Sequence, residues 1–475
     1  MIRRDVQAGE VMKVVLKLGT GCDAESHATK NVRNVANSDG NGMEAARLVH
    51  DENIADYAKL WIRMGTEILT FPFLFLAIFF ESFILVTLLS KPARSARARQ
   101  PGSETPTIAV VVPCWNEATT VGATVDSLLA LDYPAERLEI VLVDDGSTDA
   151  TPSAMARFAA NPRVRIIRKE NGGKHTALNA GIAASSAEFI GCLDADSFVE
   201  RDALREIVPC FAEPQVAAVT AAMSIHRPKS LVQHMQNAEY TFGITLRHTL
   251  ASINGLYVTP GPFSFYRRSA LEKVGGFRHG HQTEDMEMAL RLQHAGYGIE
   301  NAPRARVYTK SPDTILKLIK QRTRWTSGFL RNVLGEYRGL IGSRKHGVLG
   351  MLVLPTAVIA LGSSILLFSV MVFNTVRGVV TALQVRAGIP FSYAYLPHGR
   401  FDWFYFPVSF YVLLGVATLL TSFSLIVVGK RISKTPGSIG LGLISYTLLY
   451  GLIVPLWLMR ATADVALGKN RGWRW

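Results

Sequence analysis

Hydrophobic positions form long unbroken runs near both ends of the chain and short, regularly spaced runs in its middle. Ile68–Leu89 is strongly apolar and exceeds the about 20 residues that a membrane-spanning helix needs. Val348–Phe373, Trp403–Gly429 and Gly437–Met459 are three further runs of this kind. Gly378–Pro397 is a weaker apolar piece, interpreted as a re-entrant or interfacial segment. The simplest arrangement therefore has four spans.

Between these runs the pattern alternates short apolar stretches with amphipathic ones. Ile108–Pro113, Leu138–Val143, Val164–Ile167 and the run that leads into Asp194 are predicted to be strands; Thr119–Leu131 and Lys174–Ala184 are predicted to be helices. Repeated strand–helix units predict a parallel sheet with helices on both faces.

Polar residues follow three of these strands directly: Asn116-Glu117, Asp144-Asp145 and Asp194-Ala195-Asp196. Ligands of such sheets bind beyond the carboxyl ends of the strands. Asp194 and Asp196 are hard oxygen donors that suit Mg²⁺ or Mn²⁺, which take further ligands from water and substrate phosphates. An Asp-x-Asp pair alone is common in solvated loops, so the prediction rests on three acidic loops at one edge.

The second half of the middle region is less regular. Gln233–Leu250 is predicted to be a helix, and Pro260-Gly261-Pro262 a tight turn. Thr283 is expected to cap a helix whose first residues, Glu284 and Asp285, suit its positive end. Pro312–Asn332 is both apolar and basic, which favours an amphipathic helix along a membrane surface.

Composition and charge agree with a membrane protein. The 475 residues are 48% hydrophobic and carry a formal net charge of +13. Basic residues cluster beside the spans, at Lys91–Arg99 and Lys430–Lys434, which marks the cytoplasmic side and predicts no nucleic-acid partner. Glu81 lies inside the first span and is interpreted as a buried, hydrogen-bonded carboxyl rather than a channel-lining acid.

The four cysteines, Cys22, Cys114, Cys192 and Cys210, have neither metal-site nor disulfide spacing and are interpreted as ordinary thiols. The expected division of the chain is an N-terminal segment of unknown role (1–63), with a surface helix at Asn53–Arg63, a transmembrane helix (64–90), a basic linker (91–106), a cytoplasmic α/β domain (107–311), amphipathic interfacial helices (312–347), transmembrane helices (348–460) and a tail (461–475).

Six motifs in this order carry a resemblance: Val112–Glu117, Val143–Asp149, Asn171–Asn179, Asp194-Ala195-Asp196, Thr283-Glu284-Asp285 and the Gln-x-x-Arg-Trp sequence Gln321–Trp325. The chain resembles family 2 membrane glycosyltransferases, most of all the processive polysaccharide synthases. The resemblance implies a doubly wound, nucleotide-sugar-binding domain of the glycosyltransferase A type next to an α-helical transmembrane region.

The resemblance also implies roles for individual residues. Asp144 or Asp145 would accept a hydrogen bond from the uracil of a UDP-sugar. The implied donor-binding residues are Pro113, Glu117, Asp144, Asp145, Lys174, Asp194, Asp196, Gln321 and Arg324; Asp194 and Asp196 would hold Mg²⁺ or Mn²⁺. Trp325, Glu284 and Gly261 would bind the acceptor, and Asp285 would be the general base of an inverting transfer.

The predicted product is a β-linked polysaccharide, with UDP-N-acetylglucosamine as the expected donor, made and exported by a multi-pass protein of the inner (plasma) membrane. The expected partners are the UDP-sugar, a growing glycan or lipid acceptor, membrane lipids, and export or regulatory subunits. Two alternatives remain open. One is transfer of a single sugar to a lipid, as in ceramide glucosyltransferases. The other is a non-catalytic scaffold or transporter, in which Asp196 and Asp285 would be dispensable.

Overall fold

The computed structural model describes residues 70–90, 105–385 and 410–469. Pro72–Trp475 form one compact unit, and every contact given below lies within it. The surface helix expected at Asn53–Arg63, Cys22, most of the basic linker, the end of the weaker apolar piece beyond Val385 and the last six residues of the tail lie outside the described residues.

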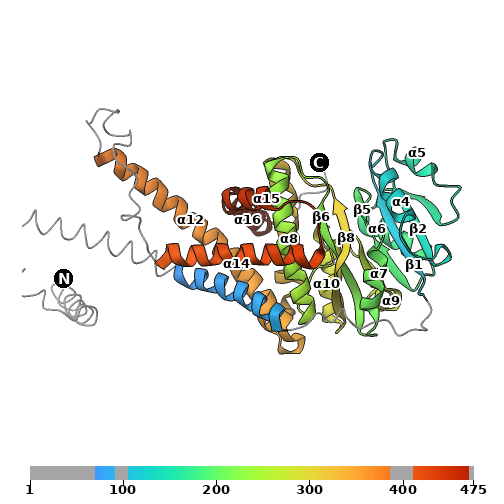
Figure 1. Cartoon of the computed structure of the whole chain (residues 1–475), viewed down its shortest axis with the longest axis horizontal. Coiled ribbons are helices and arrows are strands. Elements are labelled where there is room, and N and C mark those ends of the chain that lie inside the picture. The colour runs from blue at the N-terminus through green and yellow to red at the C-terminus, as the bar shows by residue number, and fades with distance from the viewer. Residues whose placement is uncertain (1–69, 91–104, 386–409, 470–475) are drawn as a thin grey trace, which may run out of the picture. The chain divides into compact units, whose positions relative to one another are not determined.

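The core element is an eight-stranded mixed sheet with the order β3-β2-β1-β4-β7-β6-β8-β5 (Figure 1). Its strands are β1 (Ile108–Cys114), β2 (Leu138–Asp145), β3 (Val164–Lys169), β4 (Phe189–Cys192), β5 (Ser197–Val199), β6 (Val216–Ile225), β7 (Ser264–Arg267) and β8 (Gly298–Thr309).

The first half of the sheet is parallel, as the alternating pattern predicts. Strand β1 pairs in parallel with both β2 and β4, and β2 pairs in parallel with β3. Helices α4 (Val121–Leu129), α5 (Thr151–Ala156) and α6 (Lys174–Ala183) make the crossovers between these strands. The carboxyl ends of β1, β2 and β4 therefore meet at one edge, which confirms the predicted convergence of their acidic loops.

The second half of the sheet is mixed, and it lies beyond the strand–helix units from which the parallel arrangement was predicted. Strand β7 runs antiparallel to β4 and β6, and β5 runs antiparallel to β8. The short segments Ser197–Val199 and Ser264–Arg267 account for the difference. Each has too few residues to give a periodic signal, and their direction is set by pairing with distant strands.

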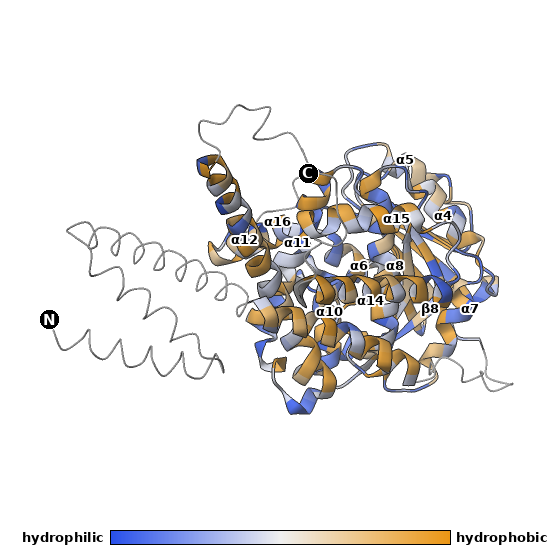
Figure 2. Ribbon diagram, turned by 60° about the vertical axis from the view of Figure 1, so that its left-hand side comes forward, coloured by the Kyte–Doolittle hydropathy of each residue, from blue (hydrophilic) through white to orange (hydrophobic). Residues whose placement is uncertain are grey.

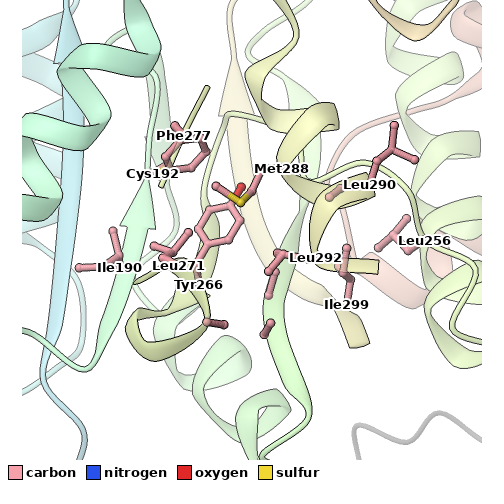
Figure 3. Packing of buried hydrophobic residues seen from close by; sticks show 14 of the residues in the cluster. Ile190, Cys192, Leu256, Tyr266, Leu271, Phe277, Met288, Leu290, Leu292 and Ile299 are labelled. Atoms are coloured by element: carbon pink, nitrogen blue, oxygen red, sulfur yellow. The ribbon is translucent and has the colours of Figure 1, made fainter. Parts of the chain in front are cut away.

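The hydrophobic core anchors helix α10 (Glu284–His294), whose second residue, Asp285, is the predicted base; Figure 3 shows the buried side chains of this helix. Met288, Leu290 and Leu292 of this helix are fully buried in the cluster that includes Ile190 and Tyr266 of the sheet. Burying a side chain of this size contributes about 1.5–3 kcal/mol relative to leaving it exposed. The core thus fixes the position of α10 against the strands that carry the other acidic loops.

Two further helices connect the sheet to the apolar helices. Helix α8 (Leu231–Ser252) contacts β6 and β8 on one side and α14 (Phe410–Ser433) on the other, as Figure 1 also shows. A capping box at its start, between Ser230 and Gln233, satisfies the exposed amides. Helix α11 (Ile315–Arg331) packs along α16 (Gly451–Ala466) and carries the Gln-x-x-Arg-Trp motif.

Within the described residues, four helices are long and apolar enough to cross a membrane: Thr70–Ser90, Leu349–Val385, Val412–Ser433 and Gly440–Ala466. Figure 2 shows the predominance of hydrophobic residues on α12 (Leu354–Val385) and α14. Glu81 accepts a 2.5 Å hydrogen bond from the Ser422 hydroxyl of α14. This contact fits the interpretation of Glu81 as a hydrogen-bonded carboxyl between helices.

Several predicted boundaries need correction. Helix α12 continues beyond Phe373 to Val385, because Val379, Val380 and Leu383 prolong the apolar pattern with no proline to stop it. The last span ends at Ala466 rather than Met459. Thr283 is the N-cap residue of α10 but makes no side-chain cap: its hydroxyl oxygen accepts from Asn332 Nδ2 at 3.1 Å, and its O–H donates to the Gly280 carbonyl at 2.8 Å.

The remaining elements complete the domain. They include α7 (Ala203–Ile207), α9 (Arg268–Val274), α15 (Gly440–Ser445) and the single turns η5 (Asn332–Glu336) and η6 (Arg338–Leu340). Cys114 and Cys192 are buried and Cys210 is half-buried, all three as free thiols, which agrees with the interpretation of ordinary cysteines.

Candidate active site

The loop after β1 is fixed against the loop after β2. Asn116 has a φ of 56°, a left-handed conformation that asparagine tolerates better than most residues. Its amide donates to Ser147 Oγ at 3.0 Å, and its side-chain oxygen accepts from the Thr148 amide at 2.9 Å. Glu117 accepts a 2.6 Å hydrogen bond from the Thr120 hydroxyl. These contacts hold Glu117 at the carboxyl edge, just beyond the last two pairs between β1 and β2, Pro113 with Val143 and Cys114 with Asp144.

The two aspartates at the end of β2 are almost entirely buried and already engaged. Asp144 accepts from the Ser147 amide at 2.9 Å and lies 3.4 Å from Arg168. Asp145 accepts from the amides of Gly172 and Gly173 at 3.1 and 2.8 Å, and pairs with Lys169 at 2.6 Å. Asp145 therefore shapes the glycine-containing turn that precedes Lys174.

Lys174 joins the two halves of the domain. Its ammonium lies 2.5 Å from Asp194 and 3.1 Å from Glu284, at the first position of α10. Burial lowers the pKa of Lys174, but Asp194, Glu284 and Asp285 outweigh it and raise the pKa above its ordinary value. Burial raises the pKa of Glu284, but the positive charge of Lys174 outweighs this effect and brings the pKa of Glu284 below its usual value. In both residues the partner charge thus favours the charged form.

Gly261 occupies the space between this ion pair and the predicted base. Its amide donates to Asp285 Oδ2 at 3.2 Å. A methyl group on Gly261 would lie 2.6 Å from Lys174 Nζ and 3.1 Å from Asp194 Oδ2. Only glycine lets the backbone approach both groups, so the turn predicted at Pro260–Pro262 lies between Asp285 and Asp194.

Asp285 is half-buried and differs electrostatically from Glu284. Burial raises the pKa of Asp285 to about 6, and the neighbouring negative charge of Glu284 adds to this rise. The Met286 amide and the Lys174 ammonium act in the opposite direction. Two adjacent carboxyls with separated pKa values are a typical arrangement for proton transfer near neutral pH.

Asp196 faces negative charge with little to offset it. Burial raises the pKa of Asp196 to about 6, and the carboxylates of Asp194 and Glu117 contribute further. Asp196 accepts a hydrogen bond from the Ser197 hydroxyl at 3.1 Å. Within the described residues no three His, Cys, Asp or Glu side chains gather as a metal cage. Two carboxylates at a strand end fit Mg²⁺ or Mn²⁺, which complete their shell with water and phosphate oxygens.

Helix α11 is packed directly against the start of α10. A methyl group on Gly328 would overlap the side chain of Thr283, so the two helices touch without a gap. Arg324 lies close enough to Glu284, Asp285 and Asp194 for their charges to raise its pKa, although burial lowers the pKa overall. Gln321 and Trp325 lie on the same helix, and the indole of Trp325 has Arg322 stacked on it.

Several residues that support the site were not identified in the sequence. Thr259 donates to the Asp285 carbonyl at 2.7 Å and accepts from Tyr266. Glu287, fully buried behind the base, is bound by Arg291 at 2.9 Å and by the Tyr337 hydroxyl at 2.6 Å. The four-residue spacing of Glu287 and Arg291 was a signal for this pair, but Tyr337 had none.

Comparison with known proteins agrees with this geometry. Residues 106–328 match the family model described as "Glycosyltransferase like family 2". Poly-beta-1,6-N-acetyl-D-glucosamine synthase of Staphylococcus epidermidis is 34% identical over 241 residues, which are 50% of this chain and 58% of that protein. The synthase of Staphylococcus aureus strain COL is 30% identical over the same shares. The chain thus spans little more than half the length of these relatives.

A mannosyltransferase from Pyrobaculum calidifontis, solved in complex with GDP-Man and Mn²⁺, shares the fold. It superposes with a TM-score of 0.57 at 20% identity and covers 86% of this chain and 98% of its own. The sheet of this chain, with its acidic edge, therefore has the same fold as that transferase. All six motifs lie within residues 106–328, so the family model matches the region that carries the resemblance.

Proposed function

We propose that the protein polymerises a sugar from a UDP-sugar donor, with UDP-N-acetylglucosamine as the best candidate, into a β-linked polysaccharide. The observation that carries the proposal is the contact of Gly261 with both Asp285 and the Lys174–Asp194 pair, which supports a single site for base and leaving group. The partial match to poly-N-acetylglucosamine synthases supports the choice of sugar and a polymeric product.

In the proposed reaction, Asp285 accepts the proton of the acceptor hydroxyl while the oxygen of that hydroxyl bonds to the anomeric carbon of the donor sugar. The bond from that carbon to the diphosphate breaks on the opposite face, and its electron pair leaves with UDP. One displacement inverts the centre, so an α-linked donor gives a β-linked product. The elevated pKa of Asp285, about 6, suits a base that must release its proton again near neutral pH.

The donor is proposed to lie along the carboxyl edge of the sheet. Glu117 and Asp144 or Asp145 would contact the nucleoside, with Pro113 beneath it, although both aspartates must share hydrogen bonds that they already make to the chain. Asp194 and Asp196 would hold Mg²⁺ or Mn²⁺, which stabilises the negative charge developing on UDP. Lys174, Gln321 and Arg324 would add positive charge or hydrogen bonds at the diphosphate. Trp325, Glu284 and Gly261 would bind the acceptor.

Four apolar helices support a location in the inner membrane, with the catalytic domain on the cytoplasmic side beside the basic segment at Lys430–Lys434. Synthesis next to the spans would allow the product to be exported as it grows. Polymer found only in the cytosol of expressing cells would contradict the export part of this proposal.

The test of the proposed activity uses membranes that contain the full chain and a panel of labelled UDP-sugars with Mg²⁺ or Mn²⁺. We expect incorporation of N-acetylglucosamine into a long product, which linkage analysis would show to be β-linked. The Asp285→Asn protein serves as the control and should form product at least about a hundredfold more slowly. A single labelled glycolipid would instead favour transfer to a lipid, and equal product from Asp285→Asn would remove the assigned base.

A further inference from the structure

One face of the Trp325 indole is covered by the side chain of Arg322, a residue of the same helix. Arg322 precedes Trp325 by three positions on α11, which places both side chains on the same side of the helix. The guanidinium carbon of Arg322 lies 4.2 Å from the centre of the indole ring, within the range of a cation–π contact. The same carbon lies 5.5 Å from the ring of Tyr240 on α8.

Arg322 is held in this position by a second helix. Its Nη2 lies 2.8 Å from Glu239 Oε2, and the side chains of Arg322 and Glu239 are only 7% and 19% exposed. Glu239 lies on α8, which also packs against β6, β8 and α14. A buried guanidinium that left its carboxylate partner would lose its compensating charge, so the pair restricts the orientation of Arg322.

We propose that Glu239 and Arg322 are positioning residues that orient the Trp325 indole toward the acceptor sugar. Arg322 occupies one face of the ring, so a sugar can stack only on the other face. Through Arg322 and Glu239, the position of Trp325 depends on α8, which itself packs against the sheet that carries the acidic loops. This inference rests on the proposed function, because it requires Trp325 to contact the acceptor.

The chemistry of the pair makes the inference specific to arginine. The guanidinium is planar and can stack on the indole while it donates hydrogen bonds to a carboxylate at its edge. A lysine would keep the charge but would not form the flat contact. Arg322 therefore differs from Lys317 of the same helix, whose pair with Asp313 at 2.8 Å is exposed and touches no aromatic ring in the described contacts.

The experiment compares Arg322→Lys, Arg322→Met and Glu239→Gln with the matched control Lys317→Met. Initial rates are measured in membranes with UDP-N-acetylglucosamine and a short β-linked N-acetylglucosamine oligosaccharide as acceptor. We expect each Arg322 variant to raise the KM for the oligosaccharide about fivefold to tenfold, with the KM for the donor unchanged. The control should behave as wild type.

A charge-swapped protein, Glu239→Arg with Arg322→Glu, separates positioning from stability. It restores an ion pair between α8 and α11 but removes the guanidinium from Trp325. We expect thermal stability close to wild type together with the raised acceptor KM. A normal acceptor KM in this protein would overturn the inference, because it would mean that the pair serves only to hold the helices together.

The emission of Trp325, taken as the difference between each protein and its Trp325→Phe counterpart, gives a readout that does not depend on activity. Removal of Arg322 should make this emission more sensitive to acrylamide, since one face of the ring loses its cover. Unchanged quenching would contradict the positioning role. If Trp325→Ala alone leaves the acceptor KM unaltered, the acceptor role in the proposed function fails instead.

Discussion

Lys174 and Glu284 form an ion pair of 3.1 Å between the start of α6 and the start of α10. The first helix belongs to the parallel half of the sheet and the second to the mixed half. Since Lys174 also pairs with Asp194 at 2.5 Å, one ammonium neutralises acidic groups from both halves. The charge of Lys174 is therefore a condition for bringing these carboxylates together.

Replacing Lys174 by Met should destabilise the protein and abolish transfer. Glu284 would remain buried without its cation, which costs about 2–4 kcal/mol for a pair of this exposure. Thermal unfolding of the detergent-solubilised protein measures this loss of stability. Lys174→Arg keeps the charge and should recover most of the stability; a Lys174→Met protein as stable as wild type would show that Glu284 and Asp194 are relieved in another way.

Asp285→Asn should reduce kcat by about 10²–10⁴, the usual contribution of a positioned general base. Binding of UDP should be unaffected, because the amide can still accept the hydrogen bond from Gly261. Steady-state kinetics and UDP binding by calorimetry check the two parts. A drop in UDP affinity with little change in kcat would place Asp285 in donor binding rather than in proton removal.

The rate should depend on pH through the same group. Burial and Glu284 raise the pKa of Asp285 to about 6, and a general base acts in its deprotonated form. We therefore expect kcat/KM to fall about tenfold per pH unit below 6 and to level off above 7. A profile with no limb between pH 5 and 7, measured on protein shown to stay folded, would contradict this assignment.

Removing divalent metal with EDTA should stop transfer, and Mg²⁺ or Mn²⁺ should restore it. Asp196→Asn should weaken this rescue and require higher metal concentrations, since one of two carboxylate ligands is lost. Activity titrated against metal concentration measures the effect. Asp202→Asn, an exposed aspartate at the start of α7, is a suitable control that should leave the titration unchanged.

Glu287→Ala should be among the most destabilising substitutions in the domain. It would leave Arg291, only 7% exposed, without a carboxylate and would cost about 3–5 kcal/mol. Tyr337→Phe removes a single hydrogen bond to Glu287 and should cost about 1–2 kcal/mol. Denaturant unfolding distinguishes the two. Equal effects would indicate that Arg291 is satisfied by the carbonyls of Val274 and Gly276 alone.

The sequence predicts the acidic edge well because its evidence is local. Each of Glu117, Asp145 and Asp194 directly follows or ends an apolar strand, and parallel order brings such strand ends together. The motif at Gln321–Trp325 likewise falls on a helix with a clear amphipathic pattern. Fold class and the meeting of the three acidic loops at one edge of the sheet could therefore be predicted before any contact was known.

Other features depend on contacts between distant segments and left no periodic signal. Glu239 and Arg322 are 83 positions apart, and neither is unusual in its own helix. The direction of β5 follows from its pairing with β8, more than 100 residues later in the chain. The cap expected at Thr283 is absent because its hydroxyl oxygen accepts a hydrogen bond from Asn332 Nδ2 instead of from an amide of α10. Local sequence does not encode such competition.

The contact between Gly328 and Thr283 leaves no space for even one additional carbon atom. Helix α11, which carries Trp325, and helix α10, which carries Asp285, therefore cannot approach each other further. Separating them would open a void in a packed interior. Elongation in the proposed synthase would then require the product to advance by one sugar after every round, while the distance between α10 and α11 stays the same.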